Sequence, residues 1–136
     1  MLCIPKKNGT LRIVFNLQQQ NENTWKDVTP FPDQDAILHD IARAKIRSKL
    51  DMTEAYEQTC IRSEDVRKTI FSTIFSTFQS QVMQMGECNA PSTFQQLMTA
   101  IFRDFLGRFV HVYLDNIFIY SQSIQEHIEH IMKVLQ

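Results

Sequence analysis

The stretch "VYLDNIFIYS", residues 112–121, places an acidic residue inside an otherwise apolar run. A carboxylate buried among Val, Leu, Ile and Phe side chains is destabilising unless a partner compensates its charge. We therefore interpret the longer segment "FVHVYLDNIFIYS", residues 109–121, as a strand, a tight turn and a second strand, with Asp115 and Asn116 at the bend. Both residue types tolerate the positive φ that such turns require. The turn would either expose Asp115 to water or bring it to a cation.

Further strands and helices are predicted on both sides of this segment. Asn8-Gly9 is a preferred pair for a two-residue turn, so residues 4–15 should form a hairpin. Apolar spacing predicts a helix over 33–45, and a short strand then ends at Asp51. The clearest helix begins near Pro91 and is expected to end at Gly107. We also expect a polar loop over 18–32, a helical turn within 53–58, a short helix over 63–69 and two strands within 70–83.

A last helix is predicted to begin at Ser123, whose capping box is completed by Glu126. His127 and His130 are interpreted as part of its solvated face, and His111 as a packed or hydrogen-bonded strand residue. The side chains expected to be buried from this helix are Ile124, Ile128, Ile131 and Leu135. Together the elements predict one α+β domain with a largely antiparallel sheet and helices on one face.

The composition is that of an ordinary globular domain, with 136 residues of which 43% are hydrophobic and 21% charged. Three separated cysteines without a CxxC pair argue against a disulfide framework or zinc cage and fit an intracellular protein, cytoplasmic or nuclear. No signal peptide is recognised, and no apolar run approaches the roughly 20 residues of a membrane span. Because the net charge is −1, nucleic-acid binding would have to depend on local basic clusters.

Two carboxylates are candidates for catalysis because each follows a strand-like apolar run. If the strands ending at Asp51 and Asp115 are neighbours, their side chains could together bind Mg²⁺, which prefers oxygen ligands. Two such ions assist phosphoryl transfer. The alternative is that both residues are surface turn aspartates. Lys6, Lys7 and Arg12 flank the first predicted hairpin turn and could bind a polyphosphate, or could simply be the solvated charges of a hairpin tip.

Four segments, in this order, resemble the reverse transcriptases of gypsy-type retrotransposons with long terminal repeats. They are "IPKKNGTLRIVFN" (4–16), "SKLDMTEAYEQTCI" (48–61), "MGECNAPSTFQQLM" (85–98) and "FVHVYLDNIFIYS" (109–121). The resemblance covers roughly Ile4 to Leu135 and implies the fingers and palm of a right-hand polymerase, with the thumb absent. Fingers elements would lie at about 1–48 and 61–83, and palm elements at about 49–60 and 84–136.

The resemblance also implies roles for individual residues. Asp51 and Asp115 match the family's metal-binding carboxylates, which hold two Mg²⁺ ions, and Asn116 stands where the family has a second consecutive aspartate. Tyr56 matches an aromatic residue that excludes a 2′-hydroxyl. By the same resemblance the nucleotide-binding residues are Lys6, Lys7, Arg12, Met52, Tyr56 and Gly86, and the residues nearest the template and primer are Tyr113, Pro91 and Gln95.

The implied function is RNA-directed DNA polymerisation, in which a primer 3′-hydroxyl attacks a deoxynucleoside triphosphate on an RNA or DNA template. A thumb, an RNase H domain and an integrase would be expected elsewhere in such a Pol polyprotein, outside these 136 residues. Because Asn116 is neutral, the activity is expected to be impaired. The alternative is a non-catalytic, degenerate remnant that acts at most as a nucleic-acid or protein interaction module.

Overall fold

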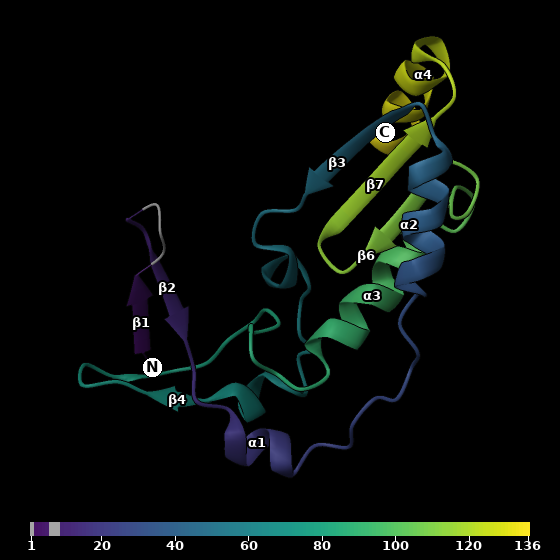
Figure 1. Cartoon of the computed structure of the whole chain (residues 1–136). Coiled ribbons are helices and arrows are strands. Elements are labelled where there is room, and N and C mark those ends of the chain that lie inside the picture. Colours follow the sequence, from purple (N-terminus) through teal and green to yellow (C-terminus); the bar gives the residue numbers. More distant parts are fainter. Residues whose placement is uncertain (1, 6–8) are drawn as a thin grey trace. The chain divides into compact units, whose positions relative to one another are not determined.

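The computed structural model describes residues 2–5 and 9–136, and these form two compact units. The first comprises Met1–Asp27 and Glu54–Ala90, and the second comprises Val28–Thr53 and Pro91–Gln136. Helices and antiparallel strands occur in both, which confirms the α+β class (Figure 1). The prediction that helices lie on one sheet face is wrong, because helical residues bond His111 on one face of the larger sheet and Ser48 on the other. The unit boundaries differ from the predicted fingers and palm boundaries, which stay a prediction.

A three-stranded antiparallel sheet organises the second unit (Figure 1). Its strands are β3 (Ile46–Asp51), β6 (Val110–Tyr113) and β7 (Asn116–Ser121), in the order β3-β7-β6. Burial alternates along β6 and β7, as expected when one sheet face meets a core. The apolar face presents Val110, Val112, Ile117 and Ile119, none more than 6% exposed. The predicted strand–turn–strand segment and the strand ending at Asp51 are thus confirmed.

Three helices complete this unit: α2 (Gln34–Arg43), α3 (Ala90–Ile101) and α4 (Ile124–Val134). The side chains of Phe94, Met98 and Phe102 are buried from and just after α3, whereas Leu97 and Ile101 on the same helix are 40% and 59% exposed. The helix ends at Ile101 rather than near Gly107, because the segment after it folds into consecutive turns. In these turns the Phe105 carbonyl accepts hydrogen bonds from the N–H groups of the residues that lead into β6.

The buried face of α4 differs from the predicted one. Ser123 caps the helix as expected, since its Oγ accepts a hydrogen bond from the Glu126 N–H at 3.3 Å. However, Ile124, Ile128 and Leu135 are 69%, 54% and 67% exposed. Of the four predicted side chains only Ile131 is half-buried, so the apolar spacing gave the wrong face for the other three.

His127 lies on the face of α4 that meets the sheet and is only 5% exposed. Its Nε2 contacts Ser48 Oγ at 2.8 Å, and its Nδ1 contacts Ser121 Oγ at 2.9 Å. Ser121 Oγ also contacts His130 Nδ1 at 2.8 Å, and the His130 ring stacks on Phe109 with centroids 3.9 Å apart. The prediction that both histidines are solvated is wrong, because the sheet's serines require polar partners that hydrophobic periodicity does not reveal.

The first unit contains two hairpins. β1 (Leu2–Pro5) pairs with β2 (Leu11–Val14), which confirms the predicted hairpin, although Lys6, Lys7 and Asn8 lie outside the described residues. Residues 18–32 are not entirely loop as predicted, because α1 (Gln18–Glu22) forms within them. The remaining elements are the short helices η1 (Ala55–Gln58) and η2 (Val66–Thr69) and the paired strands β4 (Phe71–Ser72) and β5 (Thr77–Phe78).

The contacts of His127 predict that His127→Ala lowers the free energy of unfolding by about 2–3 kcal/mol, because the half-buried Ser48 hydroxyl loses its partner and the buried Ser121 hydroxyl keeps only His130. The matched control Ile128→Ala, at the adjacent exposed position, should change it by about 0.5 kcal/mol or less. Urea denaturation of both variants measures the difference. A larger loss from Ile128→Ala would contradict the orientation of α4.

The environment of His130 predicts a pH dependence of stability. Burial, followed by the nearby charge of Lys133, lowers the pKa of His130 below its ordinary value of 6.5. The folded state therefore binds fewer protons than the unfolded state, and stability should fall as the pH drops through 6.5 toward the folded pKa. Denaturant unfolding at a pH about one unit above and one unit below 6.5 measures the change. His130→Gln should reduce this slope, and an unchanged slope would contradict the assignment.

Candidate active site

Pairing between β3 and β7 brings the two predicted carboxylates to one end of the sheet. Asp51, the last residue of β3, is the register partner of Asn116, and Asp115 immediately precedes Asn116. The Met52 N–H donates to the Asp115 carbonyl at 2.9 Å, which continues the contact one residue beyond the strand. Residues distant in sequence thus meet at one sheet end. Met52 was predicted to bind nucleotide, and its N–H is already engaged in this contact.

The tight turn lies one residue earlier than predicted. Tyr113 and Asn116 form the last pair of the β6–β7 ladder, so Leu114 and Asp115 are the turn residues. Leu114 has φ +54°, a conformation uncommon for a residue with a bulky side chain. Asn116 therefore belongs to β7 rather than to the bend. Turn-residue preference misplaced the bend because it favours Asp and Asn over Leu.

Gln95 of α3 binds the backbone on both sides of Tyr113. Its Oε1 accepts from the Leu114 N–H at 2.7 Å, and its Nε2 donates to the Val112 carbonyl at 3.2 Å. The residue is 5% exposed. Sequence reasoning missed this contact, although the position of a glutamine directly after an apolar helix residue, Phe94, was a usable signal. The predicted proximity of Gln95 to template and primer stays a prediction.

The two carboxylates have different surroundings. The Asp51 side chain is 70% exposed and lies 3.9 Å from Lys49 Nζ, a surface pair of the kind that contributes little to stability. Asp115 is half-buried, and no ion pair involves it among the described residues. Its Oδ1 accepts a hydrogen bond from Asn116 Nδ2 at 3.1 Å. Asn116 Oδ1 is buried and has no hydrogen-bond partner within the described part of the chain.

Tyr113 shares a sheet face with Asn116 and Asp51, because directly paired residues point to the same side. Its hydroxyl accepts a hydrogen bond from Gln34 Nε2, and its ring lies 6.2 Å from that of Phe31. The start of α2 thus anchors the tyrosine. Its predicted role at the primer end stays a prediction.

His111 lies on the same face of the sheet. Its Nε2 lies 2.9 Å from Oδ2 of Asp40 in α2, which confirms His111 as a hydrogen-bonded strand residue.

Most of the other predicted binding residues lie in the first unit. Tyr56 is half-buried in η1, and Arg12 lies in β2. Gly86 has φ +112°, which only glycine adopts readily, and its carbonyl accepts from Asn21 of α1 at 2.9 Å. Pro91 is in the first turn of α3, within the second unit. The nucleotide, template or primer roles of these residues stay predictions, and Lys6 and Lys7 lie outside the described residues.

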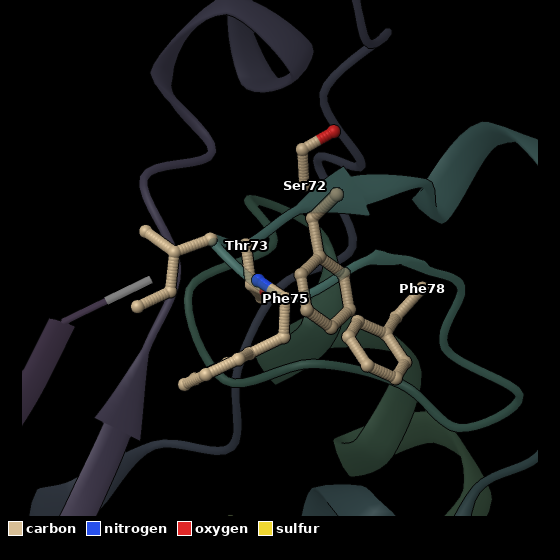
Figure 2. Close-up of a pocket in the computed structure, with 6 residues that line it drawn as sticks. Ser72, Thr73, Phe75 and Phe78 are labelled. Atoms are coloured by element: carbon tan, nitrogen blue, oxygen red, sulfur yellow. The ribbon is translucent and has the colours of Figure 1, made fainter.

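A largely apolar hollow lies beside the β4–β5 hairpin (Figure 2). At the hairpin tip, Ile74 and Phe75 are 93% and 88% exposed. Triphosphate recognition requires cations or aligned donors, and among the described residues no charged side chain lines this hollow. Its lining residues are Phe71, Ser72, Thr73, Ile74, Phe75 and Phe78, none of which was predicted to bind nucleotide.

Across the described residues, no helix has both the length and the apolar character needed to cross a membrane.

Comparison with known families matches residues 4–136 to the family described as reverse transcriptase (RNA-dependent DNA polymerase). The chain is 32% identical over 133 residues to the Pol polyprotein of transposon opus from Drosophila melanogaster, covering 96% of this chain and 13% of that polyprotein. It is 34% identical over 136 residues to the transposon Tf2-7 polyprotein of Schizosaccharomyces pombe, covering 100% of this chain and 10% of the relative.

Solved structures of foamy virus protease–reverse transcriptase share the fold. The native prototype foamy virus protein superposes with a TM-score of 0.83 at 24% identity, covering 98% of this chain and 18% of that one. A foamy viral complex with double-stranded DNA gives 0.87 at 21% identity, covering 97% and 23%. The chain therefore belongs to the reverse transcriptase family. It spans only 10–13% of the two transposon polyproteins it was compared with.

Proposed function

We propose that this chain is the nucleotidyl-transfer segment of a retrotransposon RNA-directed DNA polymerase, of gypsy type, with activity impaired at Asn116. The reaction would join a deoxynucleoside triphosphate to a primer 3′-hydroxyl, with Asp51 and Asp115 as metal ligands. The observation that supports this most is the meeting of these two carboxyl-bearing residues at one end of the β3–β7 pair. The foamy viral relatives are described in complex with double-stranded DNA and with an RNA/DNA hybrid, which supports a template–primer partner.

The residues at this sheet end have the chemistry of a magnesium site, though with fewer ligands than usual. Asp51 and Asp115 offer the oxygen donors that Mg²⁺ prefers. No three His, Cys, Asp or Glu side chains converge within the described residues, so two carboxylates would hold an ion together with water or substrate oxygens. Bound ions would stabilise negative charge on the attacking and departing oxygens. In this proposal Tyr113 supports the primer end, and Tyr56 excludes the 2′-hydroxyl.

Asn116 weakens such a site in two ways. An aspartate here would place a unit negative charge roughly 4 Å from a divalent ion, and Asn116 lacks that charge. The Coulomb attraction lost is on the order of 8 kcal/mol at an effective dielectric of 20, and solvent and relaxation compensate most of it. Each ~1.4 kcal/mol that remains is a factor of ten in rate. In addition, Asn116 Nδ2 already donates to Asp115 Oδ1, so an approaching ion competes with this hydrogen bond.

The same hydrogen bond favours the second candidate function, a non-catalytic remnant that acts at most as a nucleic-acid or protein interaction module. Asp115 Oδ1 already has a donor in the Asn116 amide, so this carboxylate has a partner without a metal. The two candidates differ in what restoring the carboxylate would do. In the first candidate the fold is intact and one charge is missing, so restoring the carboxylate would raise activity. In the second candidate it would not.

We predict that Asn116→Asp raises Mg²⁺-dependent primer extension at least tenfold, because it adds the third carboxylate. Asn116→Ala is the matched control, since it removes the amide hydrogen bond without adding charge. Without Mg²⁺ the Asn116→Asp protein should melt at a lower temperature than the parent, because two adjacent carboxylates repel. Added Mg²⁺ should reverse this loss. Single-nucleotide incorporation and thermal melting measure these effects.

Asp51→Asn introduced together with Asn116→Asp should return incorporation to background. If Asn116→Asp neither incorporates nucleotide nor gains thermal stability from Mg²⁺, the catalytic proposal is wrong and the remnant remains.

A further inference from the structure

The β6–β7 turn holds Leu114 in a conformation that its own side chain disfavours. A non-glycine residue at φ +54° is strained and persists only where surrounding contacts impose it. Leu114 immediately precedes Asp115, so its backbone sets the direction in which the carboxylate leaves the turn. Whatever imposes this conformation also positions Asp115.

Gln95 supplies that constraint by bonding backbone groups at the outer side of β6, which is an edge strand. The sheet order β3-β7-β6 leaves the outer side of β6 without a strand partner among the described residues. Unpaired edge groups are costly when buried, so they require another partner. The Gln95 amide presents a donor and an acceptor to this edge, as a strand residue would: its Oε1 accepts from the Leu114 N–H and its Nε2 donates to the Val112 carbonyl. It thereby acts as a one-residue substitute for a fourth strand.

Contacts on the other side of the turn complete its positioning. The Asp115 carbonyl accepts from the Met52 N–H at 2.9 Å, and Asp115 Oδ1 accepts from Asn116 Nδ2 at 3.1 Å. Neither contact binds the Leu114 N–H, which has Gln95 as its partner at 2.7 Å. The contact from α3 is therefore the one that bears directly on the strained residue.

We infer that Gln95 is a positioning residue for Asp115: its buried amide holds Leu114 at positive φ and so fixes the carboxylate for metal binding. This rests on the proposed function only in taking Asp115 as a metal ligand. Gln95 itself needs no contact with nucleotide, template or primer, and its 5% exposure fits an indirect role. Loss of residues that orient metal ligands typically weakens metal binding by about 10–100-fold.

The test replaces Gln95 with methionine, which has a similar length but cannot bond both backbone groups. The matched control is Gln96→Met, because Gln96 is the next residue of α3, is exposed and bonds Thr29 Oγ1 at 3.1 Å instead of the turn. Two readouts are used: amide hydrogen exchange at Leu114 and Asp115, and Mg²⁺ affinity by calorimetry. Circular dichroism confirms folding.

Gln95→Met should accelerate exchange at both amides and weaken Mg²⁺ binding about tenfold, whereas Gln96→Met should change neither. Adding Leu114→Gly should restore part of the Mg²⁺ affinity, because glycine adopts positive φ without the penalty. A residue that merely stabilised the fold would not be rescued at that position. If Gln95→Met does not fold, Gln95→Asn, which is one methylene too short to reach both groups, replaces it with the same expectations.

The outcomes separate this inference from the proposed function. Unchanged exchange at Leu114, or faster exchange with unchanged Mg²⁺ affinity, overturns the positioning role. If the parent binds no Mg²⁺ at all, the proposed function fails. Exchange then decides the inference alone: acceleration at Leu114 and Asp115 in Gln95→Met but not in Gln96→Met retains Gln95 as the positioning residue of the turn, and its absence removes it.

Discussion

The antiparallel pairing of Asp51 with Asn116 is the contact on which the candidate site depends. It brings the end of β3 beside the start of β7, and the Met52–Asp115 hydrogen bond extends that contact into the turn. A slip of one residue would point each side chain of β3 to the opposite sheet face. Such a slip is disfavoured because it would turn Ser48 away from His127, whose Nε2 contacts the Ser48 Oγ at 2.8 Å. Contacts on the face opposite Asp51 thus help to fix the geometry of the carboxylates.

Two buried side chains with paired polar atoms join the helices to this sheet. Gln95 connects α3 with the backbone of β6, and His127 connects α4 with Ser48 and Ser121. Each side chain satisfies two polar partners at once, so its removal leaves unsatisfied groups in a region of low dielectric. These contacts specify helix orientation more sharply than apolar packing, which tolerates rotation. The same specificity extends to the turn that contains Asp115.

The sequence was sufficient to predict secondary-structure elements where turn or capping residues and hydrophobic periodicity indicated the same element. The hairpin of residues 109–121, the helix containing Phe94 and the cap at Ser123 were all predictable on that basis. The bend was misplaced by one residue, because the strained Leu114 depends on a contact from a distant helix. The face of α4 was misread because a histidine, not an isoleucine, meets the sheet serines. Both errors reflect tertiary hydrogen bonds that no sequence window contains. Metal binding and nucleotide contacts stay predictions.

Paramagnetic broadening by Mn²⁺, a spectroscopic substitute for Mg²⁺, tests the shared carboxylate site most directly. In amide spectra of the labelled protein, the resonances of Met52 and Asp115 should broaden together at low Mn²⁺. Asp51→Asn or Asp115→Asn alone should reduce the broadening at both positions, because one ion is held by both side chains. Broadening at only one of the two amides, or broadening at Met52 that persists in Asp115→Asn, would contradict the account.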